Sequence, residues 1–288
     1  MTHDLKLMNK HKIIIEPNAK ASRYWKDLWN FRGLFYFLAW RDVLVRYKQT
    51  TIGILWSVLR PLLTILIFTI VFNKLGGFQS GSSVPYAIMV CAGMLPWQYF
   101  SNAFSESAGS LVANSNLVSK VYFPRLIVPA SSVIVSFIDF LISFVILIGL
   151  FFWYGFWPGW RIIALPLLLV LATVTAFGSG LFIAALNVKY RDFKFVIPFI
   201  IQFGLYISPV GYSSTVVYGN STIPVMLKYL YSLNPMVGVI DGFRWAILGE
   251  NVTTFLPGLI LSIAISFFML FFGIYYFRKT ERKFADFI

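Results

Sequence analysis

Long apolar runs, separated by short polar and basic stretches, dominate the pattern of the chain. Each run has 18 or more residues, which is the length that a helix needs to cross roughly 30 Å of hydrocarbon. The third run is longer than necessary and has room to tilt. The pattern predicts an all-α membrane protein with six transmembrane helices, at residues 52–73, 84–105, 126–154, 162–186, 195–218 and 254–277.

Two further segments are apolar but do not read as spans. Residues 32–50 are apolar in their first half and basic in their second, which predicts an N-terminal interfacial helix on the cytoplasmic leaflet. Residues 224–249 are interrupted by Asp241 and Arg244, so their uninterrupted pieces are too short to cross. We expect short re-entrant or interfacial helices there on the outer side, before the last span. An ordinary outer loop with one amphipathic helix remains an alternative.

Composition supports the membrane assignment. Of the 288 residues, 58% are hydrophobic and 12% are charged, and the mean hydropathy is +0.76. A soluble domain keeps about a quarter of its residues charged. No internal repeat or low-complexity linker divides the chain, so we expect one transmembrane domain at 32–278 between tails at 1–31 and 279–288. The first 30 residues are polar and basic, so we expect no secretory signal.

The basic residues predict the orientation. Nineteen of the 24 Lys and Arg lie on one side of the predicted spans, and four lie on the other. The positive-inside rule then places both termini in the cytoplasm and requires an even number of spans. The net charge of +13 belongs to residues that flank spans, so we assign it to anionic lipid headgroups and not to nucleic acid.

Several classes of site are missing from the sequence. It contains no G-x-x-x-x-G-K-[ST] motif, so we expect no nucleotide site and no ATP hydrolysis by this chain. The histidines are His3 and His11, and no Cys/His/Asp/Glu cluster has metal-binding spacing. The single cysteine, Cys91, reads as a small core residue. We therefore predict no catalytic residue, cofactor or metal.

Two charged residues lie inside predicted spans. Arg60 is eight residues into the first span, about 12 Å deep at 1.5 Å per residue. It either snorkels toward the cytoplasmic headgroups or faces a polar cavity and a charged ligand. Asp139 lies in the third span, where pairing with a serine or a neighbouring helix is expected more than a functional role.

Five peptides carry a family resemblance. Together, and in this order around six spans, they resemble the permease subunit of ABC-type polysaccharide exporters, the group of O-antigen, capsule and teichoic acid permeases. The resemblance covers the chain from about residue 30 onward. The peptides are "YKQTTIGILWSVLRPLL" (47–63), "NLVSKVYFPRLIVPA" (116–130), "NVKYRDF" (187–193), "SPVGY" (208–212) and "LNPM" (233–236), the last followed by Arg244.

The resemblance implies that the loop between spans two and three docks on a separate ATPase subunit. The residues suit that role: a possible N-cap, two charged contacts, two aromatic anchors and a proline that ends a short helix and starts the next span. An ordinary positively charged loop remains the alternative. The candidate coupling residues are Asn116, Lys120, Tyr122, Phe123, Pro124 and Arg125.

The resemblance also implies a homodimer with two ATPase subunits. The implied cargo is a lipid-linked polysaccharide, with O-antigen as the expected one, moved from the cytoplasmic to the outer face of the bacterial inner membrane. Two classes stay open as alternatives: an ATP-independent glycan flippase, and a membrane-embedded glycan-modifying transferase. The candidate substrate-path residues are Arg60, Tyr206 and Tyr212, and the candidate outer-gate residues are Asn234, Pro235 and Arg244.

Overall fold

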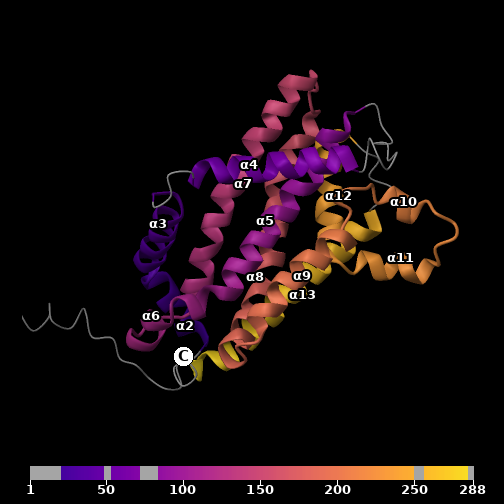
Figure 1. The fold of residues 1–288 in the computed structure, drawn as a ribbon. Helices are drawn as coiled ribbons and strands as arrows, with labels where there is room; N and C mark the ends of the chain where they lie inside the picture. Colours follow the sequence, from indigo (N-terminus) through magenta and orange to yellow (C-terminus); the bar gives the residue numbers. More distant parts are fainter. Residues whose placement is uncertain (1–20, 49–52, 72–83, 250–255, 285–288) are drawn as a thin grey trace, which may run out of the picture.

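The computed structural model describes residues 21–48, 53–71, 84–249 and 256–284. Its regular elements in these ranges are all helical, which confirms the all-α class (Figure 1). In chain order they are α2 (Ala21–Asn30), α3 (Arg32–Lys48), α4 (Gly53–Phe68), α5 (Tyr86–Ala113), α6 (Ser115–Lys120), α7 (Ile127–Tyr154), the 3-10 helix η3 (Trp160–Ala164), α8 (Leu165–Lys189), α9 (Phe193–Ile207), α10 (Thr215–Tyr218), α11 (Val225–Ser232), α12 (Pro235–Leu248) and α13 (Leu256–Glu281).

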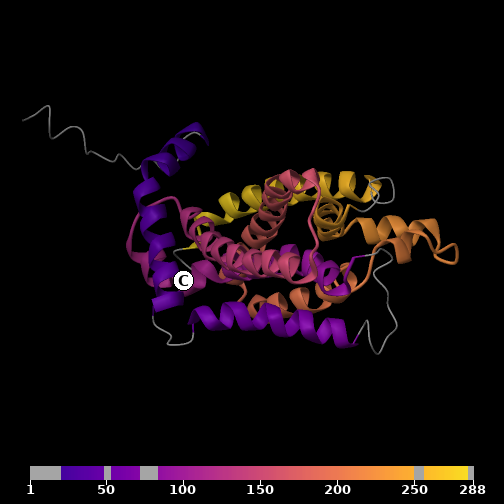
Figure 2. The same ribbon diagram turned by 90° about the horizontal axis from the view of Figure 1, so that it is seen from above.

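A bundle of long helices forms the body of the molecule. Helix α5 packs against α7 and α8, and α8 packs against α13. Helix α12 is enclosed by α5, α8 and α13, so most of its side chains are buried. Helices α2 and α6 and the C-terminal end of α13 gather at one end of the bundle, while α10 and α11 project at the other (Figures 1 and 2). We refer to these as the α6 end and the α11 end.

Three of the described helices are long and apolar enough to cross a membrane: Ile127–Tyr154, Trp160–Lys189 and Leu256–Glu281. Two shorter apolar helices, Ser57–Val71 and Phe193–Ile207, lie at two other predicted spans. Of the three long helices, Ile127–Tyr154 matches the span predicted at 126–154 to within one residue. The chain is therefore a multi-pass membrane protein, and the count of six spans stays a prediction.

Two predicted spans have different bounds in the structure. The span predicted at 195–218 is wrong in its second half, because α9 ends at Ile207. Pro209 lies two residues later and disfavours helical geometry in Ser208, the residue before it. The span predicted at 84–105 continues as a helix to Ala113, through a polar stretch that a hydropathy window does not follow.

Helix α12 has clear start and stop signals. Asn234 is its N-cap and its side chain accepts a hydrogen bond from the backbone N–H of Met236 at 3.0 Å. Pro235 occupies the first turn, where its missing N–H costs nothing. Gly249 ends the helix with φ of 75°, a left-handed conformation that suits glycine. Short helices do occupy the segment predicted as re-entrant, and their depth in a membrane stays a prediction.

Helix α3 lies across the α6 end of the bundle and packs on α7 (Figures 1 and 2). Its C-terminal turn reaches Asp139 of α7: the Tyr47 hydroxyl donates to this carboxylate at 2.5 Å, and Arg46 pairs with it at 3.3 Å. Burial and this hydrogen bond raise the pKa of Tyr47 above its usual value. The expectation that Asp139 pairs with a neighbouring helix is confirmed. The interfacial placement of 32–50 stays a prediction, and residues 49–50 lie outside the described residues.

Candidate functional site

The α6 segment, which we define as residues 115–125, is fixed to other helices at both ends. At its start, Asn114 joins α5 to α6 and accepts a hydrogen bond from Arg41 of α3 at 2.7 Å. The amide of Asn114 also donates to the carbonyl of Ser110 at 2.9 Å. Asn114 therefore links the start of α6 to both α3 and α5.

At the other end of the segment, Arg125 is bound to the last turn of α13. Its backbone N–H donates to the Glu281 carboxylate at 2.8 Å, and its guanidinium donates to the Glu281 carbonyl. The guanidinium also lies 5.9 Å from the centre of the Phe284 ring. These contacts connect the segment to a helix that lies far away in the sequence.

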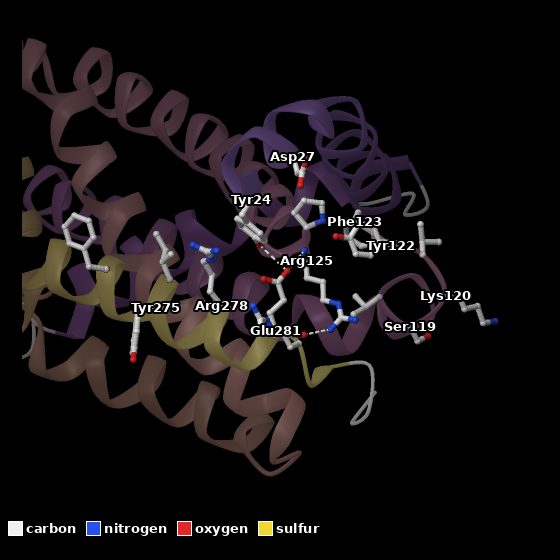
Figure 3. A pocket seen from close by; sticks show the side chains of 16 residues that line it. Tyr24, Asp27, Ser119, Lys120, Tyr122, Phe123, Arg125, Tyr275, Arg278 and Glu281 are labelled. Carbon is white, nitrogen blue, oxygen red and sulfur yellow. Dashed lines mark hydrogen bonds between the residues drawn. The ribbon is translucent and has the colours of Figure 1, made fainter. Parts of the chain in front are cut away.

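Helix α2 completes this junction. The Tyr24 hydroxyl donates to the Glu281 carboxylate at 3.2 Å, and the Arg278 guanidinium lies 4.4 Å from the centre of the Tyr24 ring. Burial, and then the nearby Glu281 carboxylate, raise the pKa of Tyr24 above its usual value, so its hydroxyl keeps its proton and acts as a donor. Figure 3 shows Tyr24, Arg125 and Glu281 converging on this point.

The segment has one buried and one exposed side. Val118 and Phe123 are 1% and 4% exposed and pack into a cluster with Leu38, Leu181 and Phe277. The outward side consists of polar, basic, aliphatic and aromatic residues: Asn116, Ser119, Lys120, Val121 and Tyr122. Of these residues, the exposed tyrosine is of a type that is enriched in protein interfaces.

Three expectations for this segment need correction. Asn116 is not the N-cap, because α6 begins one residue earlier and Asn114 holds that position. Phe123 is not an exposed anchor, since its ring fills the core described above. Pro124 does not end the short helix, which stops at Lys120 with Val121 in extended geometry. Tyr122, which is 57% exposed, is the aromatic side chain of this pair that a partner can reach.

A pocket of about 980 Å³ lies beside the segment (Figure 3). Residues 118–125 form one side of it, Tyr24 and Asp27 of α2 another, and the last turns of α13 the third. Its lining includes four basic residues and two acids: Lys120, Arg125, Arg278, Arg282, Asp27 and Glu281. Sequence reasoning missed the α13 and α2 contributions, although Glu281 stands out as an acid in a basic C-terminal run.

Near the α11 end, Arg244 of α12 is fully buried. Its guanidinium donates to the carbonyls of Val210 at 2.9 Å and Tyr212 at 2.6 Å, and so holds the turn that follows α9. An added Cβ at Gly93 of α5 would lie 3.1 Å from this guanidinium, so the glycine makes space for it. We call this arrangement the Arg244 clamp.

Hydrogen bonds on both sides support the clamp. The Tyr86 hydroxyl of α5 donates to the Gly211 carbonyl at 2.6 Å. The Asn234 amide donates to the Ser208 hydroxyl at 2.9 Å. The peptides "SPVGY" and "LNPM", which lie apart in the sequence, are therefore in contact. Asn234, Pro235 and Arg244 all belong to this assembly through α12.

The three predicted substrate-path residues form no hydrogen bonds with one another in the described parts of the chain. Arg60 is exposed on α4, and its guanidinium has no hydrogen-bond or ion-pair partner among the described residues. Tyr206 is 65% exposed on α9. Tyr212 belongs to the clamp, and its hydroxyl donates to the Ile207 carbonyl at 3.0 Å. No group of three or more potential metal ligands occurs in the described parts of the chain.

Comparison with known families decides the class of the protein. Residues 33–248 match the model of a family described as "ABC-2 type transporter", a range that includes α6 and the Arg244 clamp. The chain belongs to the ABC-2 type transporter family. Helix α13 lies outside the range matched, so the Glu281 junction connects the ABC-2 region to a flanking helix.

Several characterised proteins are similar to this ABC-2 chain. One is the "O-antigen export system permease protein RfbA" of Myxococcus xanthus, which is 27% identical over 91% of this chain and 97% of its own length. The RfbA protein of Klebsiella pneumoniae is 27% identical over 85% of this chain and 91% of its own length. The "Polysialic acid transport protein KpsM" of Escherichia coli is 22% identical over 84% and 91%. The resemblance to polysaccharide-exporter permeases is thereby confirmed.

Proposed function

We propose that this chain is the membrane-spanning permease subunit of an ATP-driven exporter that moves lipid-linked polysaccharide, with O-antigen as the cargo, out of the cytoplasm across the bacterial inner membrane. The observation that carries this proposal is its similarity to an O-antigen export permease over 97% of that protein's length. A match over nearly the whole relative includes the spans, the α6 segment and the peptides of the Arg244 clamp together.

The orientation follows from the distribution of basic residues. The α6 end carries Lys120 and Arg125 and the basic end of α13, so we place it in the cytoplasm, with both termini. Helices α10 and α11 then face the outside. Six spans, a single transmembrane domain at 32–278 and an interfacial helix at 32–50 complete the proposed topology.

The energy for export comes from a separate ATPase subunit, because this chain has no phosphate-binding loop. The exposed side of the α6 segment is the proposed docking surface. Tyr122 supplies the aromatic anchor, with Lys120 and Asn116 beside it, while Phe123, Pro124 and Arg125 position the segment from behind. Two copies of the chain form a homodimer, the usual solution for a self-complementary membrane subunit.

The substrate path is proposed to pass the exposed faces of α4 and α9. Arg60 and Tyr206 lie on these faces, and both side chains are exposed in the single chain. The Arg244 clamp, with Asn234 and Pro235, forms the frame of the outer gate, and Tyr212, which is half-buried, is the aromatic residue of the clamp on the proposed path. An arginine on an otherwise apolar exposed face suits an anionic or sugar-bearing substrate.

A deletion tests this function. Cells that lack the chain should synthesise the lipid-linked polysaccharide but retain it on the cytoplasmic side, where an impermeant antibody or glycosidase does not reach it. The chain supplied in trans should restore surface polysaccharide, and it should do so only when the ATPase subunit is also present. Normal surface polysaccharide in the deletion strain would overturn the proposal.

A further inference from the structure

The pocket beside the α6 segment continues the apolar surface of α13. Its wall includes Phe271 and Tyr275, which are 68% and 64% exposed. Helix α13 is one of the three described helices that are long and apolar enough to cross a membrane. Exposed aromatic side chains on such a helix face lipid and not water, because contact with water would leave a large apolar surface exposed to solvent. The pocket is therefore open toward the lipid along α13.

The same wall ends in two arginines. Arg278 lies in the last turn of α13 and Arg282 follows directly after the helix, and both line the pocket. Neither guanidinium donates a hydrogen bond or forms an ion pair within the described parts of the chain, and Arg278 packs on the Tyr24 ring. A guanidinium carries five N–H donors in a planar fork that matches phosphate oxygens. Most of the donor capacity of this wall is therefore available to a ligand.

The opposite side of the pocket adds positive charge. Arg125 lies across from α13 and is held there by its two hydrogen bonds to Glu281 (Figure 3). Lys120 lies at the rim and points away in that view. The acids in the lining are Asp27 and Glu281, and the Glu281 carboxylate already accepts from Tyr24 and Arg125. The four cations exceed the two acids, which favours an anionic ligand.

We propose that this pocket binds the phosphate group of a lipid in the leaflet at the α6 end, which is the cytoplasmic leaflet in the orientation proposed above. Arg278 and Arg282 are the main donors, Arg125 contacts the phosphate from across the pocket, and the lipid chain lies along Phe271 and Tyr275. Basic pockets at the ends of membrane helices bind such headgroups. Arginine and phosphate form short, charge-assisted hydrogen bonds.

Two sources can supply this group. One is an anionic phospholipid, and the other is a polyprenyl diphosphate, as on a lipid-linked glycan; both carry phosphate on an apolar chain. An acidic side chain of a protein partner would also meet the arginines, but it would not need an apolar wall that is continuous with the lipid-facing surface. The inference concerns the purified chain alone, so it stands or fails independently of the exporter function.

The test measures retained lipid by native mass spectrometry. The full-length chain is delipidated in detergent and then mixed with equal concentrations of dioleoylphosphatidylglycerol and dioleoylphosphatidylcholine. The wild-type chain should retain the anionic lipid in preference. The variant R278Q/R282Q should reduce that retention about 30-fold, which is the effect expected when two basic residues near a lipid headgroup lose their charge. The matched control K189Q/K194Q removes two charges elsewhere at the same end and should change it less than about twofold.

A second pair of variants tests the apolar wall. F271A/Y275A should weaken retention of the anionic lipid, while F268A, which truncates an exposed aromatic of α13 outside the pocket, should not. Undecaprenyl diphosphate as a competitor distinguishes the sources. If it displaces phosphatidylglycerol at an equal or lower concentration, the ligand is the lipid-linked substrate; if it does not, the ligand is a phospholipid.

Two results would overturn the proposal. One is equal retention of the two phospholipids by a wild-type chain with normal thermal unfolding. The other is an R278Q/R282Q variant that unfolds normally and keeps the anionic lipid; if this variant also fails to bind the ATPase subunit, the pocket serves a protein contact instead.

Discussion

The Glu281 carboxylate accepts a hydrogen bond from the backbone N–H of Arg125 at 2.8 Å, across 156 positions of sequence. This bond joins the last turn of α13 to the segment that precedes α7. The Glu281 carbonyl accepts a second bond from the same residue, and Tyr24 of α2 donates to the carboxylate. These bonds therefore connect the α6 segment directly to α13, and α13 to α2.

Replacing Glu281 by Leu should loosen this junction. The substitution leaves the Arg125 N–H and the Tyr24 hydroxyl without their acceptor, which costs about 2 kcal/mol of folding free energy in a partly buried site. Glu281→Gln keeps an amide oxygen as a neutral acceptor and should cost about half as much. Thermal unfolding in detergent measures both. A Glu281→Leu chain as stable as the wild type would show that the junction does not hold the segment.

Tyr122 and Phe123 should behave differently although they are adjacent. Tyr122→Ala removes an exposed side chain, so it should leave folding unchanged and weaken ATPase binding about 30-fold if the tyrosine is an interface hot spot. Phe123→Ala opens a cavity in the core and should destabilise the fold by about 3 kcal/mol. Co-purification of a tagged ATPase subunit, together with thermal unfolding, separates the two effects.

A second test of the docking surface is Lys120→Glu. It reverses a charge on the exposed side of the segment and should weaken ATPase binding without affecting stability. If Tyr122→Ala and Lys120→Glu both bind the ATPase as the wild type does, the exposed side of the α6 segment is not the docking surface.

The Arg244 clamp should be essential to the α11 end. Arg244→Met leaves the carbonyls of Val210 and Tyr212 buried without their donor, which should cost about 2–5 kcal/mol. Arg244→Lys cannot reproduce the two-pronged geometry and should rescue only part of this loss. Tyr212→Phe, which removes the hydroxyl that donates to Ile207 but leaves the backbone carbonyl that Arg244 binds, should cost about 1 kcal/mol or less. A stable Arg244→Met chain would remove the basis for the clamp.

Much of the fold could be predicted from apolar length alone. The span at 126–154 agrees with α7 because a long uninterrupted run has one simple solution in a membrane. Pro209 was a signal in the sequence that α9 ends near Ile207. The apolar residues that follow Pro209 kept the hydropathy high, so the predicted span continued past the end of the helix. Hydropathy averages over such a break, whereas backbone geometry does not.

The sites were harder to predict, because they depend on contacts between distant residues. The pattern identified Arg244 as unusual, but it could not show that the guanidinium binds the carbonyls of "SPVGY". It identified Tyr122 and Phe123 as a pair, but not that one faces outward and the other inward. The role of Glu281 depends on α13 returning to the α6 end, which no local signal contains.

The proposed orientation predicts which exposed positions react from outside. In a Cys91→Ser background, Ser221→Cys should react with an impermeant thiol reagent in intact cells, since it lies between α10 and α11. Lys189 is also exposed in the structure but lies at the α6 end, so Lys189→Cys should react only after the cells are opened. Labelling of Lys189→Cys in intact cells would contradict the proposed topology.

The central claim is that this chain carries lipid-linked polysaccharide across a membrane when a separate ATPase subunit hydrolyses ATP. The most direct test reconstitutes the chain with that subunit in vesicles that contain the lipid-linked glycan. A glycosidase sealed inside the vesicles reports the glycan that crosses to their interior. Cleavage that requires ATP, the ATPase subunit and this chain together is the predicted result. Cleavage at the same rate without ATP, or without this chain, would contradict the account.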